Sequence, residues 1–158
     1  MSETAAFDMT PQTLPGPTGE SNRLSMHPKG TVLCLGPTTE IGLAQAVQAL
    51  GAGCGVVIVA PGAEAAAKPL ADAGAPVIAI DGTVAADALT TLDGIEVAAA
   101  AGASDWTRAL RVALAGRKGP VVPLETQIVA PERFVVERHL CIDTTAAGGN
   151  ASLLASAE

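Results

Sequence analysis

Short apolar runs alternate with stretches of helical composition over residues 31–125, and this alternation limits the possible folds more than any other feature. The runs read "TVLCL", "GVVIVAP", "APVIAI", "IEVAAAA" and "PVVPLE", and they begin near residues 31, 56, 76, 95 and 121. A short continuous apolar run bounded by turn residues is typical of a buried strand. Because strands that are apolar on both faces belong to parallel sheets covered by helices, the alternation predicts an α/β domain.

The first two segments between these runs carry helix signals. In "TTEIGLAQAVQALG", residues 38–51, either Thr38 or Thr39 is the expected N-cap, because a threonine hydroxyl can accept a free amide of the first turn. In "GAEAAAKPLADAG", residues 62–74, Pro69 is expected to weaken or kink the helix.

Two more helices are predicted further along the chain. "DGTVAADALTTLDG", residues 81–94, predicts a short helix with Thr83 as its cap, and "SDWTRALRVALAGRKG", residues 104–119, predicts a longer helix capped by Ser104. The basic pair at residues 117–118 lies near the negative end of that last helix, where cations are favourable. Together these elements predict a Rossmann-like parallel sheet of about five strands with helices on both faces.

Both ends of the chain depart from this pattern. Residues 1–30 contain proline and glycine at a density that disfavours long helices and interior strands, which predicts an extended linker. Residues 126–158 predict a β-arm followed by a tail of small residues. In the arm, alternate side chains share one side: Phe134, Val136, Arg138, Leu140 and Ile142. Such a strand is expected to pair with a hairpin partner or with another chain; the alternative is an antiparallel edge strand of the main sheet.

The charge of the chain excludes two classes of partner. Its formal net charge is −7, whereas nucleic acids and anionic membranes are bound by clustered lysine and arginine. Only "GRKG" is locally basic, and it is interpreted as a helix end. No apolar run approaches the roughly 18–20 residues that cross a bilayer, so no membrane insertion is expected. The first residues lack the basic and apolar regions of a signal peptide, which predicts a cytoplasmic protein.

Neither the cysteines nor the histidines form a metal-binding pattern. Cys34, Cys54 and Cys141 lack CxxC spacing and are expected to be buried, reduced thiols. His27 and His139 lie far apart with no paired ligand motif, so no metal site is predicted.

The sequence also shows no recognisable set of catalytic residues, such as a nucleophile paired with a base. Ser25 and His27 fall in the proline-rich leader without a nearby acid, and Cys34 falls inside an apolar strand, where a thiol is inert. His139 lies between charged neighbours on the arm and is interpreted as part of a solvated face. The sequence therefore predicts no catalytic residue and no catalysis by this chain alone.

The Rossmann-like pattern raises the possibility of a dinucleotide-binding site. Such a site requires particular residues at two positions of the sequence, and both can be checked. After the first strand, in "LGPTTEIG", Gly36 and Gly42 can take the first and last glycine positions, but Pro37 and Thr38 replace the middle glycine. At the end of the second strand, where an acid would hold the ribose, residues 60–61 are alanine and proline. Both tests fail, which predicts a degenerate domain that binds no cofactor.

Three segments carry a resemblance to a known family: "LPGPTGESNRL" at residues 14–24, "KGTVLCLGP" at residues 29–37 and "ERHLCIDTTAAGGNASLL" at residues 137–154. In this order and spacing they resemble the C-terminal domain of the longer proline utilization A proteins, which are bifunctional bacterial enzymes that oxidise proline to glutamate. The resemblance is most specific in "TTAAGGNAS", while the middle of the chain matches only as a general α/β pattern.

The resemblance implies a non-catalytic role for this chain. In that family a flavin-dependent proline dehydrogenase and an NAD-dependent L-glutamate-γ-semialdehyde dehydrogenase use FAD and NAD, and the latter belongs to the aldehyde dehydrogenase superfamily. The C-terminal domain is similar to the Rossmann domain of that superfamily and lacks the catalytic cysteine. Its arm and tail pack over the dehydrogenase and help to enclose the path of the intermediate. The present chain is then expected to be non-catalytic and to hold no cofactor of its own.

The tail is the candidate contact with the dehydrogenase domain, in cis or from another protomer. Its small residues permit close backbone approach, and its two leucines can be buried. The predicted contact residues are Thr144, Thr145, Ala146, Ala147, Gly148, Gly149, Asn150, Ala151, Ser152, Leu153 and Leu154. Two alternatives remain open at this point: an autonomous NAD-binding protein, and a structural module that associates with itself.

Overall fold

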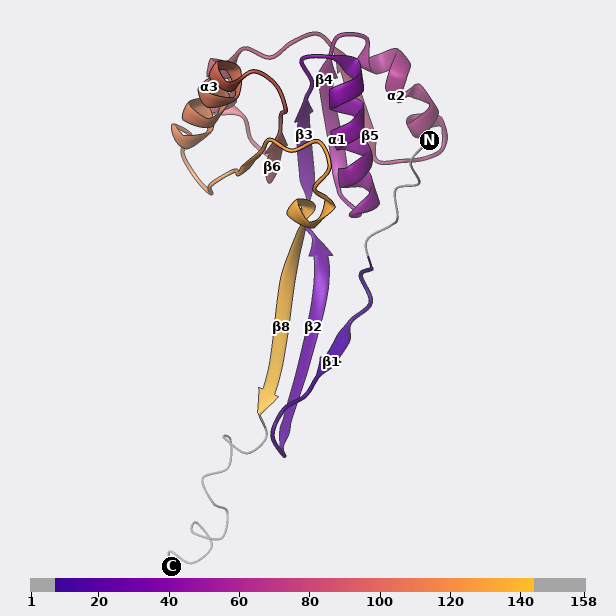
Figure 1. Ribbon diagram of the computed structural model, residues 1–158, viewed down its shortest axis with the longest axis vertical. Coiled ribbons are helices and arrows are strands. Elements are labelled where there is room, and N and C mark those ends of the chain that lie inside the picture. The colour runs from indigo at the N-terminus through magenta and orange to yellow at the C-terminus, as the bar shows by residue number, and fades with distance from the viewer. Residues whose placement is uncertain (1–7, 144–158) are drawn as a thin grey trace, which may run out of the picture. The chain divides into compact units, whose positions relative to one another are not determined.

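A computed structural model describes residues 8–143 of the chain (Figure 1). These residues divide into two compact units. The first unit comprises residues 28–135 and contains the α/β sheet, whereas the second comprises residues 8–27 and 136–143. Among the described residues, no helix is long and apolar enough to cross a membrane.

The first unit is built on a five-stranded sheet in which every pair of neighbours is parallel. The spatial order is β5-β4-β3-β6-β7. The strands are β3 (Thr31–Leu35), β4 (Gly55–Ala60), β5 (Val77–Asp81), β6 (Val97–Ala99) and β7 (Leu124–Glu125). The predicted Rossmann-like α/β class is therefore confirmed. The fifth strand is shorter than predicted and begins after the exposed Val121.

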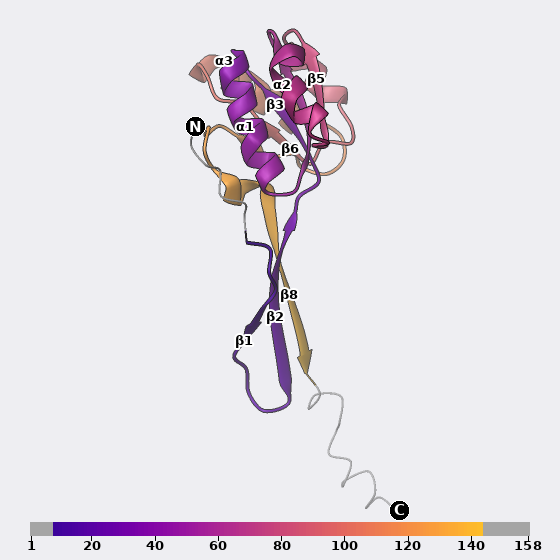
Figure 2. The same ribbon diagram turned by 90° about the vertical axis from the view of Figure 1, so that its right-hand side faces the viewer.

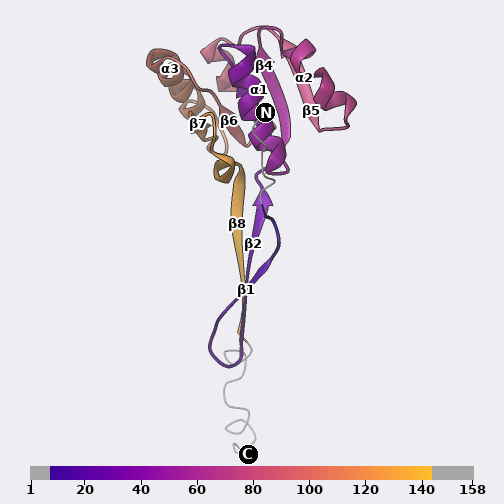
Figure 3. The ribbon, with the colours of Figure 1, turned by 45° about the vertical axis from the view of Figure 1, so that its right-hand side comes forward.

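Helices cover the sheet unequally. Helix α1 (Thr39–Gly51) packs against β3 and β4, and α2 (Ala63–Asp72) lies beside the edge strand β5 (Figure 3). The other face is covered by α3 (Ser104–Ala115) and by η1 (Ala86–Thr91). Since η1 is a 3-10 segment shorter than the helix predicted over residues 81–94, it leaves part of this face open.

The core follows the alternation of each strand. On the α3 side, aliphatic side chains of β3, β4 and β6 pack with Leu89 of η1 and with Leu110 and Leu114 of α3. On the β5 edge of the same face, Ile78 and Ile80 are 63% and 48% exposed. They lie opposite Val57 and Val59 in the β4–β5 register, so they extend the apolar face beyond the cover of η1.

The helix ends confirm one predicted cap and correct two. The hydroxyl of Thr38 accepts a hydrogen bond from the Ile41 amide at 3.4 Å, as expected of an N-cap. In contrast, neither Thr83 nor Ser104 caps a helix: η1 follows Ala85, and α3 follows Ala103, without any side-chain cap.

The basic pair at residues 117–118 directly follows the C-cap of α3, Gly116, and so lies near the negative end of the helix, as predicted. No basic residue lies in the last turn of α3. Arg117 donates from Nε to the carbonyl oxygen of Leu92 at 2.9 Å, and its Nη2 makes a second bond to the same oxygen. The guanidinium therefore ties the end of the η1 segment to the chain that directly follows α3.

The second unit is a three-stranded sheet with the order β1-β2-β8 (Figures 1 and 2). Its strands are β1 (Gln12–Leu14), β2 (Glu20–Pro28) and β8 (Val135–Asp143). The last residue of β2, Pro28, and the first of β8, Val135, belong to the first unit. β1 and β2 are antiparallel, with Thr13 opposite Arg23. The segment η2 (Pro131–Phe134) precedes β8. We refer to this three-stranded sheet as the arm.

The arm corrects the prediction for residues 1–30. Part of that segment forms the strands β1 and β2, and β2 is the central strand of the arm, so the segment is not simply a linker. The prediction that β8 pairs with a hairpin is confirmed, and the alternative of an edge strand on the main sheet is wrong. The turn that joins β1 to β2 contains Pro17, whose carbonyl oxygen accepts from the Glu20 amide at 3.0 Å.

Candidate functional site

The first candidate site is the crevice where strand order reverses. From β3 the chain proceeds to β4 on one side, whereas β6 lies on the other side of β3 and leads on to β7. In open α/β sheets, ligands bind outside the carboxyl ends of the strands at this switch point. The segments that border it are residues 36–38, after β3, and residues 100–103, after β6.

The two glycines of the partial fingerprint are used for packing. A Cβ on Gly36 would lie 2.3 Å from the Thr38 carbonyl oxygen and 2.7 Å from the Gly42 amide nitrogen. A Cβ on Gly42 would lie 3.4 Å from the Ala60 Cβ and from the Gly36 Cα. Their absent side chains thus let α1 start close to the end of β3 and rest on β4. These glycines are explained without a phosphate.

Apolar side chains meet at the switch point itself. A Cβ on Gly102 would lie 3.0 Å from Cε3 of Trp106 and 3.4 Å from Cγ of Pro37. Trp106 also packs against the core cluster on the α3 side. The indole and the proline ring therefore lie beside the loops where a pyrophosphate would need free amides, and Pro37 itself has no amide to offer.

The end of β4 offers no ribose contact either. The Thr39 hydroxyl donates to the Pro61 carbonyl oxygen, which joins the loop after β4 to the start of α1. The neighbouring acid, Asp81 at the end of β5, accepts from the Glu64 amide at 2.8 Å. This carboxylate satisfies a free amide in the first turn of α2, where negative charge is favourable.

The structure brings together one pair of candidate catalytic residues. Ser25 and His27 lie on β2, not on a flexible leader, with Oγ and Nε2 separated by 2.9 Å. The Ser25 hydroxyl also donates to the Arg138 carbonyl oxygen at 3.4 Å. His139 lies on β8 and is exposed, as interpreted from its charged neighbours. A catalytic histidine is oriented by an acid, whereas the partner of the His27 ring is the Ser25 hydroxyl, so the pair serves the arm's own hydrogen bonding.

The three cysteines have different environments. Burial raises the pKa of the Cys34 thiol to about 12, and nearby Cys54 adds to the effect, so Cys34 stays protonated and inert at neutral pH. Cys54 is buried and donates from Sγ to the Phe134 carbonyl oxygen at 3.3 Å. Cys141 is exposed, which corrects the expectation that all three are buried. The described residues contain no group of three or more potential metal ligands.

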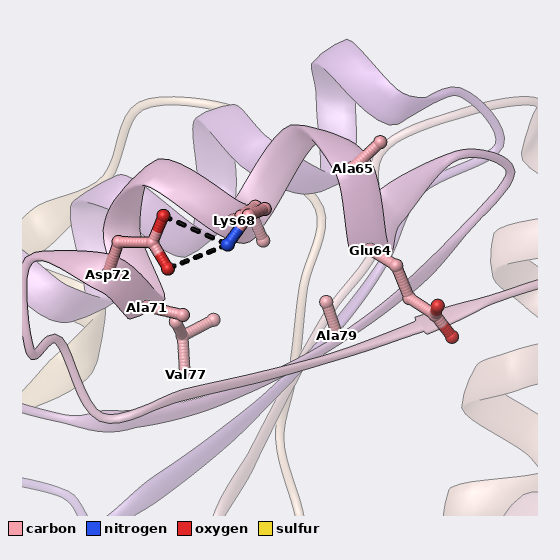
Figure 4. Close-up of a pocket in the computed structure, with 8 residues that line it drawn as sticks. Glu64, Ala65, Lys68, Ala71, Asp72, Val77 and Ala79 are labelled. Atoms are coloured by element: carbon pink, nitrogen blue, oxygen red, sulfur yellow. Dashed lines mark hydrogen bonds and ion pairs between the residues drawn. The ribbon is translucent and has the colours of Figure 1, made fainter.

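A third candidate is the hollow between α2 and β5, of about 540 Å³ (Figure 4). Its floor is alanine and valine, and its one cation, Lys68, is bound by Asp72 at 2.9 and 3.0 Å. Ligand sites combine apolar walls with a few convergent polar groups. Here Lys68 and Asp72 are engaged with each other along α2, and Glu64 is the one other charged side chain of the lining, so the hollow lacks a set of convergent polar groups.

The arm exposes a row of aliphatic side chains on one of its faces. On β8, Val136, Leu140 and Ile142 are 39%, 55% and 50% exposed and, being alternate residues, they share one face. Three-stranded sheets are stable when one face is covered by apolar packing. Residues 144–154, the predicted contact segment that follows β8, lie outside the described residues.

Comparison with solved structures identifies proteins that share this fold. The chain superimposes on the aldehyde dehydrogenase of Brucella melitensis biovar abortus 2308 with a TM-score of 0.55 and 22% identity, over 66% of this chain and 25% of that one. This likeness shows the fold alone, a Rossmann-like α/β domain. No family model matches the sequence.

More specific matches identify the relatives. The chain is 34% identical, over 151 residues, to the bifunctional protein PutA of Escherichia coli strain K12, covering 92% of this chain and 11% of that protein. A crystallised variant of proline utilization A (PutA) from Bradyrhizobium japonicum gives a TM-score of 0.63 and 31% identity, over 73% of this chain and 13% of that one. The chain is therefore homologous to PutA and spans about a tenth of the length of the curated relatives it matches.

Proposed function

We propose that this chain is a non-catalytic module of a PutA-type enzyme, which covers and supports the L-glutamate-γ-semialdehyde dehydrogenase site and the path of its intermediate. The observation that carries the proposal is the arm: a small sheet with an open apolar face, on a chain homologous to PutA. Covering that face requires a surface that the described residues of the arm do not supply. A dehydrogenase domain, in cis or from another protomer, is the expected partner.

The test is a rescue experiment. A PutA protein lacking the segment homologous to this chain is assayed for NAD-dependent oxidation of L-glutamate-γ-semialdehyde, with and without the full 158-residue chain. Restored turnover supports the proposal. A chain that ends at Asp143 serves as the matched variant for the tail, and it is expected to bind without restoring turnover. If the full chain neither binds nor restores turnover, the proposal is wrong.

We further propose that the chain binds no NAD of its own. Two observations support this part of the proposal: Pro37 and Trp106 lie beside the switch point, and alanine and proline stand at the end of β4 in place of an acid. Trp106 is the only tryptophan, so its fluorescence reports on the crevice. Titration with NADH is expected to leave the emission of Trp106 unchanged after correction for absorption. Saturable quenching would favour the alternative, an autonomous NAD-binding protein.

A further inference from the structure

The two faces of the arm carry opposite charge. The Ser25 hydroxyl bonds the Arg138 carbonyl oxygen, and the Lys29 amide bonds that of Phe134 at 2.9 Å. Lys29 directly follows β2 and Phe134 directly precedes β8, and the two contacts are four residues apart in each segment, which places Ser25 opposite Arg138 in an antiparallel register. Because opposite residues point to the same side, the face of each side chain follows from alternation.

One side, the arginine face, carries the exposed aliphatic side chains together with cations. It comprises Arg23, His27, Val136, Arg138, Leu140 and Ile142. No carboxylate of the described strands points to this side. The acids of β2 and β8 all lie on the other side, the acidic face, which carries Glu20, Glu137 and Asp143.

The guanidinium groups of the arginine face form no ion pair within the described part of the arm. Arg23 and Arg138 are both exposed, and neither guanidinium joins an ion pair among residues 8–143. On the acidic face, by contrast, Leu24 and Met26 are already half-buried. The exposed aliphatic side chains and the arginines without an ion pair therefore lie on the same side of the sheet.

We propose that the arginine face is the docking face of the arm, and that its occupant is an apolar patch edged by aspartate or glutamate on the dehydrogenase part of a PutA-type enzyme. This inference rests on the proposed function and specifies its contact. An arginine beside an aliphatic stripe can bind a carboxylate through two parallel N–H···O bonds while the stripe loses contact with water. The acidic face lies outside this contact, so the exposed carboxylate of Glu137 needs no desolvation.

The test compares adjacent residues that point to opposite sides of β8. Arg138→Glu is expected to weaken binding of the full chain to the shortened PutA at least about tenfold, because a repelling charge replaces a complementary one. Glu137→Lys, the matched control, is expected to change the dissociation constant less than about twofold, as rim and solvent-facing charges do. Both sites are exposed, and circular dichroism melting checks that each variant is folded.

A steric comparison provides a second readout. A bulky maleimide on native Cys141, which lies on the acidic side, is expected to leave binding intact. The same label on a Leu140→Cys, Cys141→Ser chain is expected to abolish binding. Salt sharpens the comparison, since the affinity of the unaltered chain should fall between 0.05 and 0.5 M NaCl more steeply than that of Arg138→Glu.

The outcomes separate this inference from the proposed function. If the unaltered chain fails to bind, both are overturned. If it binds and Glu137→Lys or the Cys141 label is the more harmful change, the proposed function stands and the arginine face is the wrong surface. Sedimentation of the chain alone identifies a second copy as the occupant if Arg138→Glu dissociates a dimer, and that result also overturns the inference.

Discussion

The α/β unit and the arm use similar aliphatic residues but differ in what covers them. Leu110 of α3 is fully buried among side chains from three strands, whereas Leu140 of β8 is 55% exposed. Burial of one leucine side chain contributes about 1.5–3 kcal/mol, so only the first unit realises that contribution within the described chain. The difference shows that the α/β unit has a buried core of its own, while the aliphatic side chains of β8 stay exposed among the described residues.

The largest expected effect is on thiol reactivity. At pH 8 we expect Cys141 to react with a thiol reagent within seconds, and Cys34 and Cys54 to react at least about 1,000-fold more slowly, because they require an opening of several kcal/mol. The raised pKa of Cys34 slows it further, since the thiolate is the reactive form. Counting modified cysteines by mass spectrometry checks this, with the denatured chain as control. Three equally fast thiols would mean that the α/β core is open.

A leucine substitution in each unit tests the comparison directly. Leu110→Ala is expected to lower the free energy of unfolding by about 2–5 kcal/mol, because it leaves a cavity in the core. Leu140→Ala is expected to change it by less than about 0.5 kcal/mol in the isolated chain. Urea unfolding of both variants gives the two values, and similar losses would contradict the division.

Alanine substitutions at two glycines of the α/β unit test whether the close approach of α1 to β3 stabilises the fold. Gly36→Ala is expected to cost about 1–3 kcal/mol, since its Cβ would meet backbone atoms of the α1 start that cannot move aside. The matched control is Gly55→Ala, whose Cβ would find only the Pro76 carbonyl oxygen, 3.9 Å away. Thermal melting of both variants is the measurement. Equal melting temperatures would mean that the close approach of α1 to β3 is not required.

The smallest effect is expected at the ion pair on α2. Lys68 and Asp72 are 70% and 62% exposed, and exposed pairs one helical turn apart contribute about 0.3–0.5 kcal/mol. Lys68→Ala should therefore shift the urea midpoint only slightly, and the shift should vanish in high salt. A loss above about 1 kcal/mol, on the order of a core substitution, would show that the hollow beside α2 matters for stability.

Most strands and helices of the α/β unit could be predicted from local patterns in the sequence. Its strands are continuous apolar runs, and α1 carries its own cap in Thr38, so these elements depend on residues close together in the chain. The η1 segment is shorter than the helix predicted there. It is rich in threonine and aspartate, which hydrogen-bond to nearby backbone, as the Thr90 hydroxyl does to the Asp87 carbonyl oxygen at 2.6 Å.

Local pattern predicted that β8 pairs with a hairpin, but not that the hairpin is formed by residues near the start of the chain. The Ser25–Arg138 contact joins residues 113 positions apart, and proline near β2 argued against an interior strand. At the switch point, the failed fingerprint predicted the missing glycine and acid. The position of Trp106 beside Gly102 and Pro37 was not predictable, because it depends on how α3 returns to the sheet.

The ends of the α/β unit lie next to each other. The Lys29 amide donates to the Phe134 carbonyl oxygen at 2.9 Å, and Lys29 Nζ donates to that of Arg133 at 2.7 Å, so the entering and leaving chain are joined at one point. A unit with adjacent ends can be inserted into a surface loop of a host protein, or cut and rejoined elsewhere, without crossing its core. Residues 28–135 are therefore expected to tolerate transfer into another protein as one piece.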